Sequence, residues 1–271
     1  MDNIKDIIRK RKSVRTYDGR PLSDEDKKKL TDYMKESDNP FGIPVEFRIL
    51  DAKAHKLSSP VIVGTDCYVA AKAGRVPQFE IAYGYSFEKF CLYAESLGIG
   101  TVILAGTLSR KTFEAAMELT ENEAMPVATP VGYPAIKKSV REKLMRKAIK
   151  ADERLPFEKL FFKNSFAQSL TSAGAGKFLD ALEMVRLAPS AVNKQPWRVV
   201  ACDNTAHFFK KKSKGMTTDS FDVQKIDMGI ALAHFDMTLQ ENGIEGYFAV
   251  KEYDFVVDDS LEYIISYELK H

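Results

Sequence analysis

The chain has 271 residues, with 40 lysines and arginines against 38 aspartates and glutamates, so its formal net charge is +2. Hydrophobic residues make up 45% of the sequence and aromatic residues 11%, with 15 glycines and 11 prolines. These values exclude collagen-like, mucin-like and disordered chains, and the near-balanced charge gives no electrostatic reason to expect nucleic acid as the main ligand.

The first part of the chain alternates predicted helices and strands. Ser23 is an N-cap candidate before an acidic first turn, which predicts a helix over residues 23–35. Apolar residues at i, i+3, i+4 and i+7 predict a helix over 87–97, which Gly98 ends. Short runs rich in β-branched residues predict strands at 46–50, 60–65, 101–105 and 128–132.

The second part continues this alternation. A helix over 178–187 is predicted to end before Pro189, because the residue before a proline disfavours helical angles. Residues 226–239 are apolar on nearly every face, so we expect a helix that is buried on all sides. Strands are predicted at 198–202, 246–250 and 261–269, and the whole pattern indicates an α+β fold.

The two parts resemble each other in the order of their elements. Three pairs of positions show this, at separations of 150, 145 and 133 residues: Phe47 with Trp197, Gly98 with Gly243, and Val131 with Ile264. The recurrence indicates an internal duplication, although α/β chains also repeat such elements by chance. We expect two halves, residues 1–160 and a shortened 161–271, with a joint near 155–175.

The first candidate binding motif is RKSVR at residues 11–15. Arg11, Lys12 and Arg15 surround the hydroxyl of Ser13 within five residues. Guanidinium groups bind phosphate in bidentate fashion and a hydroxyl adds a further donor, so this composition fits a phosphate and its neighbouring oxygens. A solvated basic patch or a nuclear-import-like run is the alternative interpretation.

The second candidate motif is APSAVNKQPW at residues 188–197, in which two prolines stiffen a short polar loop. Ser190, Asn193 and Gln195 can donate and accept hydrogen bonds at the edge of a flat heterocycle, and Pro189 can pack on its face. The alternative is a plain loop between a helix and a strand.

A third segment, TVILAGT at 101–107, places Ala105 and Gly106 after a predicted strand. A glycine there lets a backbone N–H approach a ligand closely, although a tight strand end explains it equally well. SAGAGK at 172–177 lacks the spacing of a phosphate loop, and LGIG at 97–100 ends a helix, whereas a dinucleotide fingerprint begins one.

The remaining polar residues predict neither a disulfide framework nor a metal site. The cysteines are far apart and the histidines are not at ligand spacing: Cys67, Cys91 and Cys202; His55, His207, His234 and His271. The opening residues lack the apolar core of a signal peptide, and the longest apolar runs fall far short of the roughly 20 residues of a membrane span. We therefore expect a cytoplasmic protein without a membrane partner.

Together, RKSVRTYD and APSAVNKQPW resemble the two signature segments of the FMN-dependent nitroreductase superfamily. Its members are usually homodimers with FMN at the subunit interface. The resemblance implies that the basic segment holds the flavin phosphate, ribityl chain and pyrimidine edge, and that a strand-end loop donates a backbone N–H to the flavin N5. The Pro-Ser-x-x-Asn-x-Gln-Pro segment is implied to come from the other subunit.

In this chain the two segments are 177 residues apart, and each half lacks one of them. DNPFGIPVEF stands at 38–47 where a proline-rich segment is expected, and FFKNSF stands at 161–166 where a basic one is expected. The chain thus resembles the single-chain tandem subfamily, a nitroreductase dimer fused into one polypeptide with one intact flavin site and a decayed twin. The resemblance implies these site residues: Arg11, Lys12, Ser13, Arg15, Ala105, Gly106 and Arg154 from the first half, and Pro189, Ser190, Ala191, Asn193 and Gln195 from the second.

Two of these residues depart from the family pattern or rest on little context. Ala105 stands where an acidic residue is usual, so the contact to N5 is left to the backbone alone. Arg154 is assigned by its place in ERLPF, as the basic residue that adds a phosphate contact.

The resemblance implies hydride transfer from NAD(P)H through FMN to a nitroaromatic, quinone or similar acceptor, with no catalytic acid or base. Lys12 or Arg15 would stabilise the negative charge of the reduced flavin. Alternatives are a non-catalytic FMN-binding or storage protein, a flavin enzyme of the oxygen-dependent or dehalogenating type, and a nucleic-acid-binding protein that uses RKRKSVR. The chain is expected to be a monomeric pseudo-dimer or a homodimer of such chains.

Overall fold

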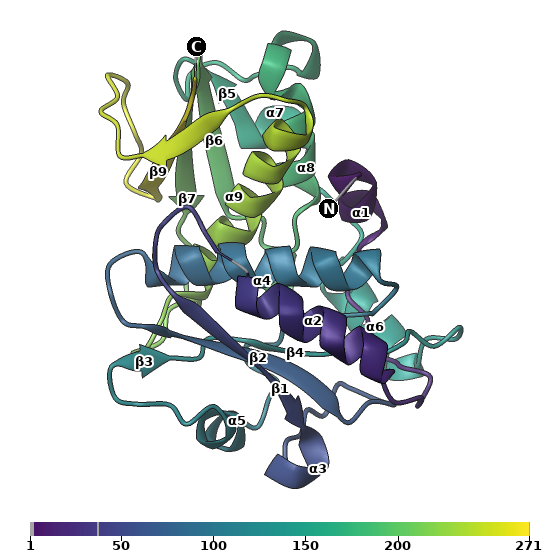
Figure 1. Ribbon diagram of the computed structural model, residues 1–271. Helices are drawn as coiled ribbons and strands as arrows, with labels where there is room; N and C mark the ends of the chain where they lie inside the picture. The colour runs from purple at the N-terminus through teal and green to yellow at the C-terminus, as the bar shows by residue number, and fades with distance from the viewer. Residues whose placement is uncertain (1–2, 37, 271) are drawn as a thin grey trace.

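The computed structural model describes residues 3–36 and 38–270. Two separate β-sheets lie at opposite ends of the molecule, and two long helices, α4 (Phe79–Ser96) and α9 (Val223–Glu241), cross between them (Figure 1). This arrangement confirms the predicted α+β fold. None of the helices in the described ranges is long and apolar enough to cross a membrane.

The first sheet has β2 at its centre, paired in antiparallel fashion with each of its three neighbours. The helices α2 and α4 pack against it and share its hydrophobic core (Figure 1). The elements of this part are α1 (Ile4–Lys10), α2 (Asp24–Glu36), β1 (Val45–Asp51), α3 (Ala52–His55), β2 (Cys67–Gly74), α5 (Arg110–Ala116), β3 (Glu123–Ala124), β4 (Ala128–Pro130) and α6 (Val140–Ala148).

The second sheet has the strand order β5-β6-β7-β9-β8. Its first pair is parallel and the other pairs are antiparallel. The elements of this part, apart from α9, are α7 (Phe157–Leu160), β5 (Phe161–Lys163), α8 (Leu179–Leu187), β6 (Trp197–Cys202), β7 (Thr205–Lys211), β8 (Gly246–Ala249), β9 (Leu261–Leu269) and the short 3-10 turns Ser172–Gly174, Gly176–Phe178 and Ala191–Asn193.

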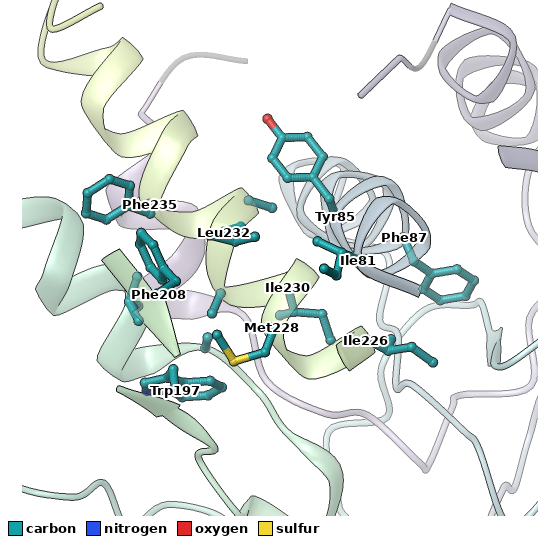
Figure 2. Packing of buried hydrophobic residues seen from close by; sticks show 14 of the residues in the cluster. Ile81, Tyr85, Phe87, Trp197, Phe208, Ile226, Met228, Ile230, Leu232 and Phe235 are labelled. Carbon is teal, nitrogen blue, oxygen red and sulfur yellow. The ribbon is translucent and has the colours of Figure 1, made fainter. Parts of the chain in front are cut away.

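The two central helices touch at a pair of glycines. A Cβ atom at Gly84 of α4 would lie 2.1 Å from the carbonyl oxygen of Ile226, and one at Gly229 of α9 would lie 2.1 Å from that of Ile81. Figure 2 shows the side chains of α4 and α9 that surround this contact. Because Gly84 and Gly229 are 145 positions apart, as are Ile81 and Ile226, the crossing is symmetric between the halves.

The pairing of the outer strands follows the same symmetry and corrects one expected register. Leu104 bridges Ala128 in the first half, and Ala249, 145 positions after Leu104, pairs with Ser266 in the second. Ser266 is therefore the counterpart of Ala128, at a separation of 138, so the separation of 133 read between these strands was wrong. The middle of β9 is buried without alternation, so its sequence does not fix its register.

The predicted helices agree with the structure more closely than the predicted strands do. The helix predicted over 87–97 begins eight residues earlier, at Phe79, because residues 79–86 are buried on most faces and so show no amphipathic period. The predicted strand 60–65 is wrong: only Val63 forms a bridge there, to Thr16. Likewise, 101–105 forms only isolated bridges, and β2 and β7 were not predicted.

Candidate functional site

A cavity of about 380 Å³ lies between the two halves, within the range of about 300–1,000 Å³ of small-molecule and cofactor sites. Eleven of the twelve predicted site residues line it, and Gln195 does not. Ser13 and Ser190, 177 positions apart in the sequence, thus face one space. Further walls come from Val102 and Leu104, from α6 and the loop after it, and from the first turns of α9.

The basic segment reaches the cavity as an extended chain. It begins at Arg11, the residue that follows the last turn of α1, and it runs beside Thr101, to whose carbonyl the Val14 N–H donates at 2.9 Å. Successive side chains of an extended chain point to opposite sides, so Arg11, Ser13 and Arg15 share the side that faces the cavity while Val14 is buried. Lys12 lies at the exposed edge of the cavity.

Two guanidinium groups in the cavity wall have nitrogen atoms without a partner. Arg15 is only 8% exposed, and its Nε and Nη1 find no hydrogen-bond acceptor among the described residues, nor does the Nε of Arg154. Burial lowers the pKa of both side chains, as the cost of desolvating a cation requires. Buried donors without acceptors are costly, so these groups are suited to an anionic or carbonyl-rich ligand.

Arg11 is held from behind by a buried network that joins the two halves. Its Nε lies 3.6 Å from Oε1 of Glu88, a fully buried residue of α4. The same oxygen lies 2.9 Å from Nε2 of His234 on α9, whose Nδ1 is 2.8 Å from the carbonyl oxygen of Met184. Because a carbonyl only accepts, Nδ1 carries the hydrogen. Sequence reasoning missed Glu88 and His234, which are remote from both motifs.

The proline-rich loop owes its shape to its own polar side chains. Val192, Asn193 and Gln195 have φ values of 44°, 56° and 48°, in the left-handed region that residues other than glycine rarely adopt. Ser190 Oγ accepts from the Gln195 N–H at 2.9 Å, and Asn193 Nδ2 donates to the Lys150 carbonyl at 2.7 Å. Such strain is typical of functional sites that their surroundings hold in place.

Gln195 has a different position from the one expected for it. The sequence analysis places its amide at the edge of a heterocycle, but its Oε1 accepts from the backbone N–H of Leu155 at 2.9 Å, and the residue is buried outside the cavity. The amide therefore ties the proline-rich loop to the segment that carries Arg154. Asn193, by contrast, lines the cavity and also donates hydrogen bonds to that segment.

Asp227 is a cavity residue that the sequence analysis missed. It is 3% exposed, and its two carboxyl oxygens lie 3.0 and 3.2 Å from the Ala191 N–H that they accept from. Burial raises its pKa to about 8. The group is therefore largely a neutral acid at pH 7, able to donate a hydrogen bond. Its signal in the sequence was an acidic residue, like Asp236, within a helix predicted to be buried on nearly every face.

Arg110 fixes the strand-end loop that contains Ala105 and Gly106. Its Nη2 donates to the carbonyls of Ala105 at 2.8 Å and Pro126 at 2.9 Å, and its Nη1 donates to that of Met125 at 2.7 Å. Gly106 is exposed at the cavity. The loop is thus held by a side chain from the following helix, α5, which the sequence analysis did not identify.

The pseudo-symmetric counterpart of the cavity is filled with aromatic rings. Tyr85 and Phe248 are the counterparts, at a separation of 145, of the cavity residues Ile230 and Ile103. Phe41 lies in the loop before β1, as the proline-rich loop lies before β6, and its ring centroid is 5.9 Å from that of Tyr85 and 5.4 Å from that of Phe248. The counterpart positions therefore pack against one another.

No group of three or more metal-ligating side chains lies close together within residues 3–36 and 38–270. His271 lies outside the described residues. The donor set of the cavity fits FMN: cations and partnerless N–H groups suit its phosphate and ring carbonyls, and the apolar walls formed by Val102, Leu104 and Ile230 suit its flat ring.

Comparisons with known proteins show the family and the fold of the chain. A family model described as "Putative TM nitroreductase" matches residues 3–239. The crystal structure of a protein from Thermotoga maritima MSB8 described as a "putative nitroreductase" is similar in fold, with a TM-score of 0.65 and 20% identity, over 99% of this chain and 93% of that one. A nitroreductase family protein from Clostridium novyi NT matches 51% of this chain and 89% of its own at 18% identity and a TM-score of 0.43. No match is found among curated protein sequences.

Proposed function

Because the chain belongs to the family described as putative TM nitroreductase, we propose that it is an FMN-dependent oxidoreductase that passes hydride from NAD(P)H to a nitroaromatic, quinone or similar acceptor. One observation carries the proposal: the basic segment and the proline-rich loop, from opposite halves, line one cavity in which buried guanidinium nitrogens lack partners. FMN, when bound, supplies the two-electron chemistry, as flavins do.

The residues of the first half would bind the polar parts of the cofactor. Arg11 and Arg154 would hold the phosphate, with the Ser13 hydroxyl as a further donor. Arg15 and Lys12 would place positive charge where reduction of a flavin adds negative charge. Ala105 and Gly106 would present backbone N–H groups to the ring, in a loop that Arg110 holds in place.

The residues of the second half would close the site from the other side. Pro189, Ser190, Ala191 and Asn193 line the cavity, and Gln195 would act by holding the loop. We propose that residues 1–160 and 161–271 are the two halves of a fused dimer and that the aromatic cluster of Phe41, Tyr85 and Phe248 leaves one flavin site per chain.

The test is an absorption spectrum of the purified chain, followed by turnover. We expect a bound flavin with a ratio near one per chain, and steady oxidation of NADH or NADPH when a quinone or nitroaromatic is added. A ratio near two would contradict the filled twin site. A flavin-loaded protein without turnover would favour FMN storage, and a chain that takes up no FMN on reconstitution would refute the proposal.

A further inference from the structure

A second hollow adjoins the cavity along α6 and the turn that follows it. It is lined by Lys138, Lys143, Arg146, Lys147, Lys150, Ala151, Asp152 and Glu153. Three of these residues, Arg146, Ala151 and Asp152, also line the cavity. A ligand whose ring lies in the cavity can therefore extend into the hollow across this shared wall.

The hollow has more positive charge than its acidic residues neutralise. Arg146 is paired with Asp152, and Lys150 is paired with Glu153 at 3.2 Å. Lys138, Lys143 and Lys147 form no ion pair with any residue in the part of the chain that the structure describes, which leaves three lysines for a ligand.

The surrounding segment reinforces this charge. Residues 137–150 contain seven lysines and arginines and one acidic residue, Glu142. Glu142 is 3% exposed and accepts from the hydroxyl of Thr16 at 2.8 Å, so it does not face the hollow. The positive field of the lysines is thus uncompensated locally, and it attracts anions.

The helix α6 separates two chemistries. Met145 and Ile149 give the cavity an apolar wall, whereas Lys143 and Lys147, four positions apart on α6, share the face turned to the hollow, and Lys150 joins them from the turn after the helix. A dinucleotide has flat aromatic rings and anionic phosphates. Its ring can pack against the apolar wall while its phosphates lie beside the lysines. The phosphate of FMN already has cations of its own in Arg11 and Arg154, so the lysines suit a second phosphorylated molecule.

We infer that this lysine hollow binds the phosphates of the donor nucleotide and makes the chain prefer NADPH to NADH. The inference rests on the proposed function. A 2′-phosphate adds about two negative charges to a position where NADH has a neutral hydroxyl, and lysines bind such a group as point charges. The hollow holds no unpaired carboxylate placed for a free ribose hydroxyl, since Asp152 and Glu153 are both in ion pairs.

The test is calorimetry on the flavin-loaded protein with 2′,5′-ADP, 5′-AMP and inorganic phosphate as probes, alongside steady-state kinetics with both donors. We expect 2′,5′-ADP to bind at least about tenfold more tightly than 5′-AMP, the lower end of the range for hydrogen bonds to charged groups, and to weaken as salt is added. The double variant Lys143→Gln/Lys147→Gln should lose most of this difference and most of the preference for NADPH. Its flavin content should match that of the wild type.

A matched control removes the same charge elsewhere. Lys35 and Lys214 are exposed and do not line the hollow, so Lys35→Gln/Lys214→Gln should leave the affinity for 2′,5′-ADP and the preference for NADPH unchanged. Equal binding of 2′,5′-ADP and 5′-AMP by the wild type would overturn the inference. So would binding of inorganic phosphate as tight as that of 2′,5′-ADP, or loss of flavin from the Lys143/Lys147 variant, which would assign the hollow to the FMN phosphate. If neither donor reduces the flavin, the proposed function fails, and the calorimetry still decides whether the hollow binds the nucleotide.

Discussion

Arg11 lies between the buried carboxyl group of Glu88 and the cavity. Its Nε is 3.6 Å from Glu88, which is fully buried. Removing the guanidinium therefore does two things: it removes a donor for an anionic ligand, and it takes from the buried Glu88 carboxyl group one of its partners, the other side chain being His234, which destabilises the fold. The two effects can be separated by experiment.

We predict that Arg11→Ala weakens FMN binding about tenfold to a hundredfold and also lowers the free energy of unfolding. Arg11→Ala/Glu88→Gln also replaces the buried carboxyl group with an amide, which can donate to His234 Nε2, and should recover much of the stability but none of the FMN affinity. Flavin fluorescence titration and urea unfolding measure the two quantities. Recovery of FMN affinity in the double variant would mean that Arg11 only neutralises Glu88.

Asp227 predicts a pH dependence of stability. Its pKa of about 8 in the folded chain lies above the ordinary value of 3.8, so the folded state holds this proton more tightly than the unfolded state does. As pH rises from about 4 to about 8, the unfolded chain releases the proton first, and stability is lost by up to about 1.4 kcal/mol per pH unit.

Asp227→Asn removes this titration while keeping an oxygen for the Ala191 N–H. In the FMN-free protein, the variant should therefore gain stability relative to the wild type as pH rises from 5 to 8. Urea unfolding at both pH values measures the difference. A difference that stays constant across this window would show that Asp227 ionises at its ordinary pKa.

The sequence was informative about single residues where a motif gathers them. RKSVR and APSAVNKQPW are contiguous, so their composition predicts a site, and the site residues predicted from them line the cavity, with the exception of Gln195. Asp227 and Arg110 act through backbone groups outside their own helices, and nothing in their local composition distinguishes them from ordinary charged residues. Gln195 was misplaced because a local pattern does not say which way an amide turns.

Among the elements, the crossing of α4 and α9 is the one most sensitive to a single atom. Exchanging a glycine for alanine inside a helix ordinarily stabilises it by up to about 1 kcal/mol. At Gly84 and Gly229 the added Cβ would meet a backbone carbonyl oxygen at 2.1 Å, and backbone cannot move aside as a flexible side chain can.

We therefore predict that Gly84→Ala and Gly229→Ala each destabilise the fold by about 1–3 kcal/mol, the cost of overpacking, and loosen FMN because the cavity lies between the halves. Gly74→Ala is the matched control, since a Cβ atom there has nothing within 4 Å. Thermal unfolding of the three variants measures the effect. Melting temperatures at or above that of the wild type for the two helix variants would contradict the close contact.

The elements also show what a sequence pattern can reveal. The ends of α8 and α9 and the start of α2 at Ser23, whose Oγ accepts from the Asp26 N–H at 3.0 Å, follow from capping residues and prolines. The strand β2, by contrast, reads CYVAAKAG and is buried on both faces. It has neither alternation nor many β-branched residues, so its pairing emerges only from tertiary contacts.

At the scale of the whole molecule, one cavity would serve both the electron donor and the acceptor. The two substrates would then have to occupy it in turn, which gives ping-pong kinetics. We predict parallel lines in double-reciprocal plots of rate against donor at several fixed concentrations of a quinone. Intersecting lines would show that donor and acceptor bind together, in separate places.

The overall architecture was predicted from the repeated order of elements together with the resemblance carried by the two motifs. The family match over residues 3–239 confirms that resemblance. The aromatic side chains that fill the pseudo-symmetric counterpart of the cavity were not predicted. Phe41, Tyr85 and Phe248 come from a loop, a helix and a strand, and only the folded chain shows that the three rings meet.

Joining both halves in one polypeptide also changes how the protein can diverge. Both subunits of a homodimer have the same sequence, so a substitution that fills one of two symmetric pockets with an aromatic ring fills the other as well. Here Phe248 packs in the filled twin position, while its counterpart Ile103 lines the cavity. One half can therefore change without the same change in the other half. Because the halves are covalently joined, dilution cannot dissociate them as it can a dimer.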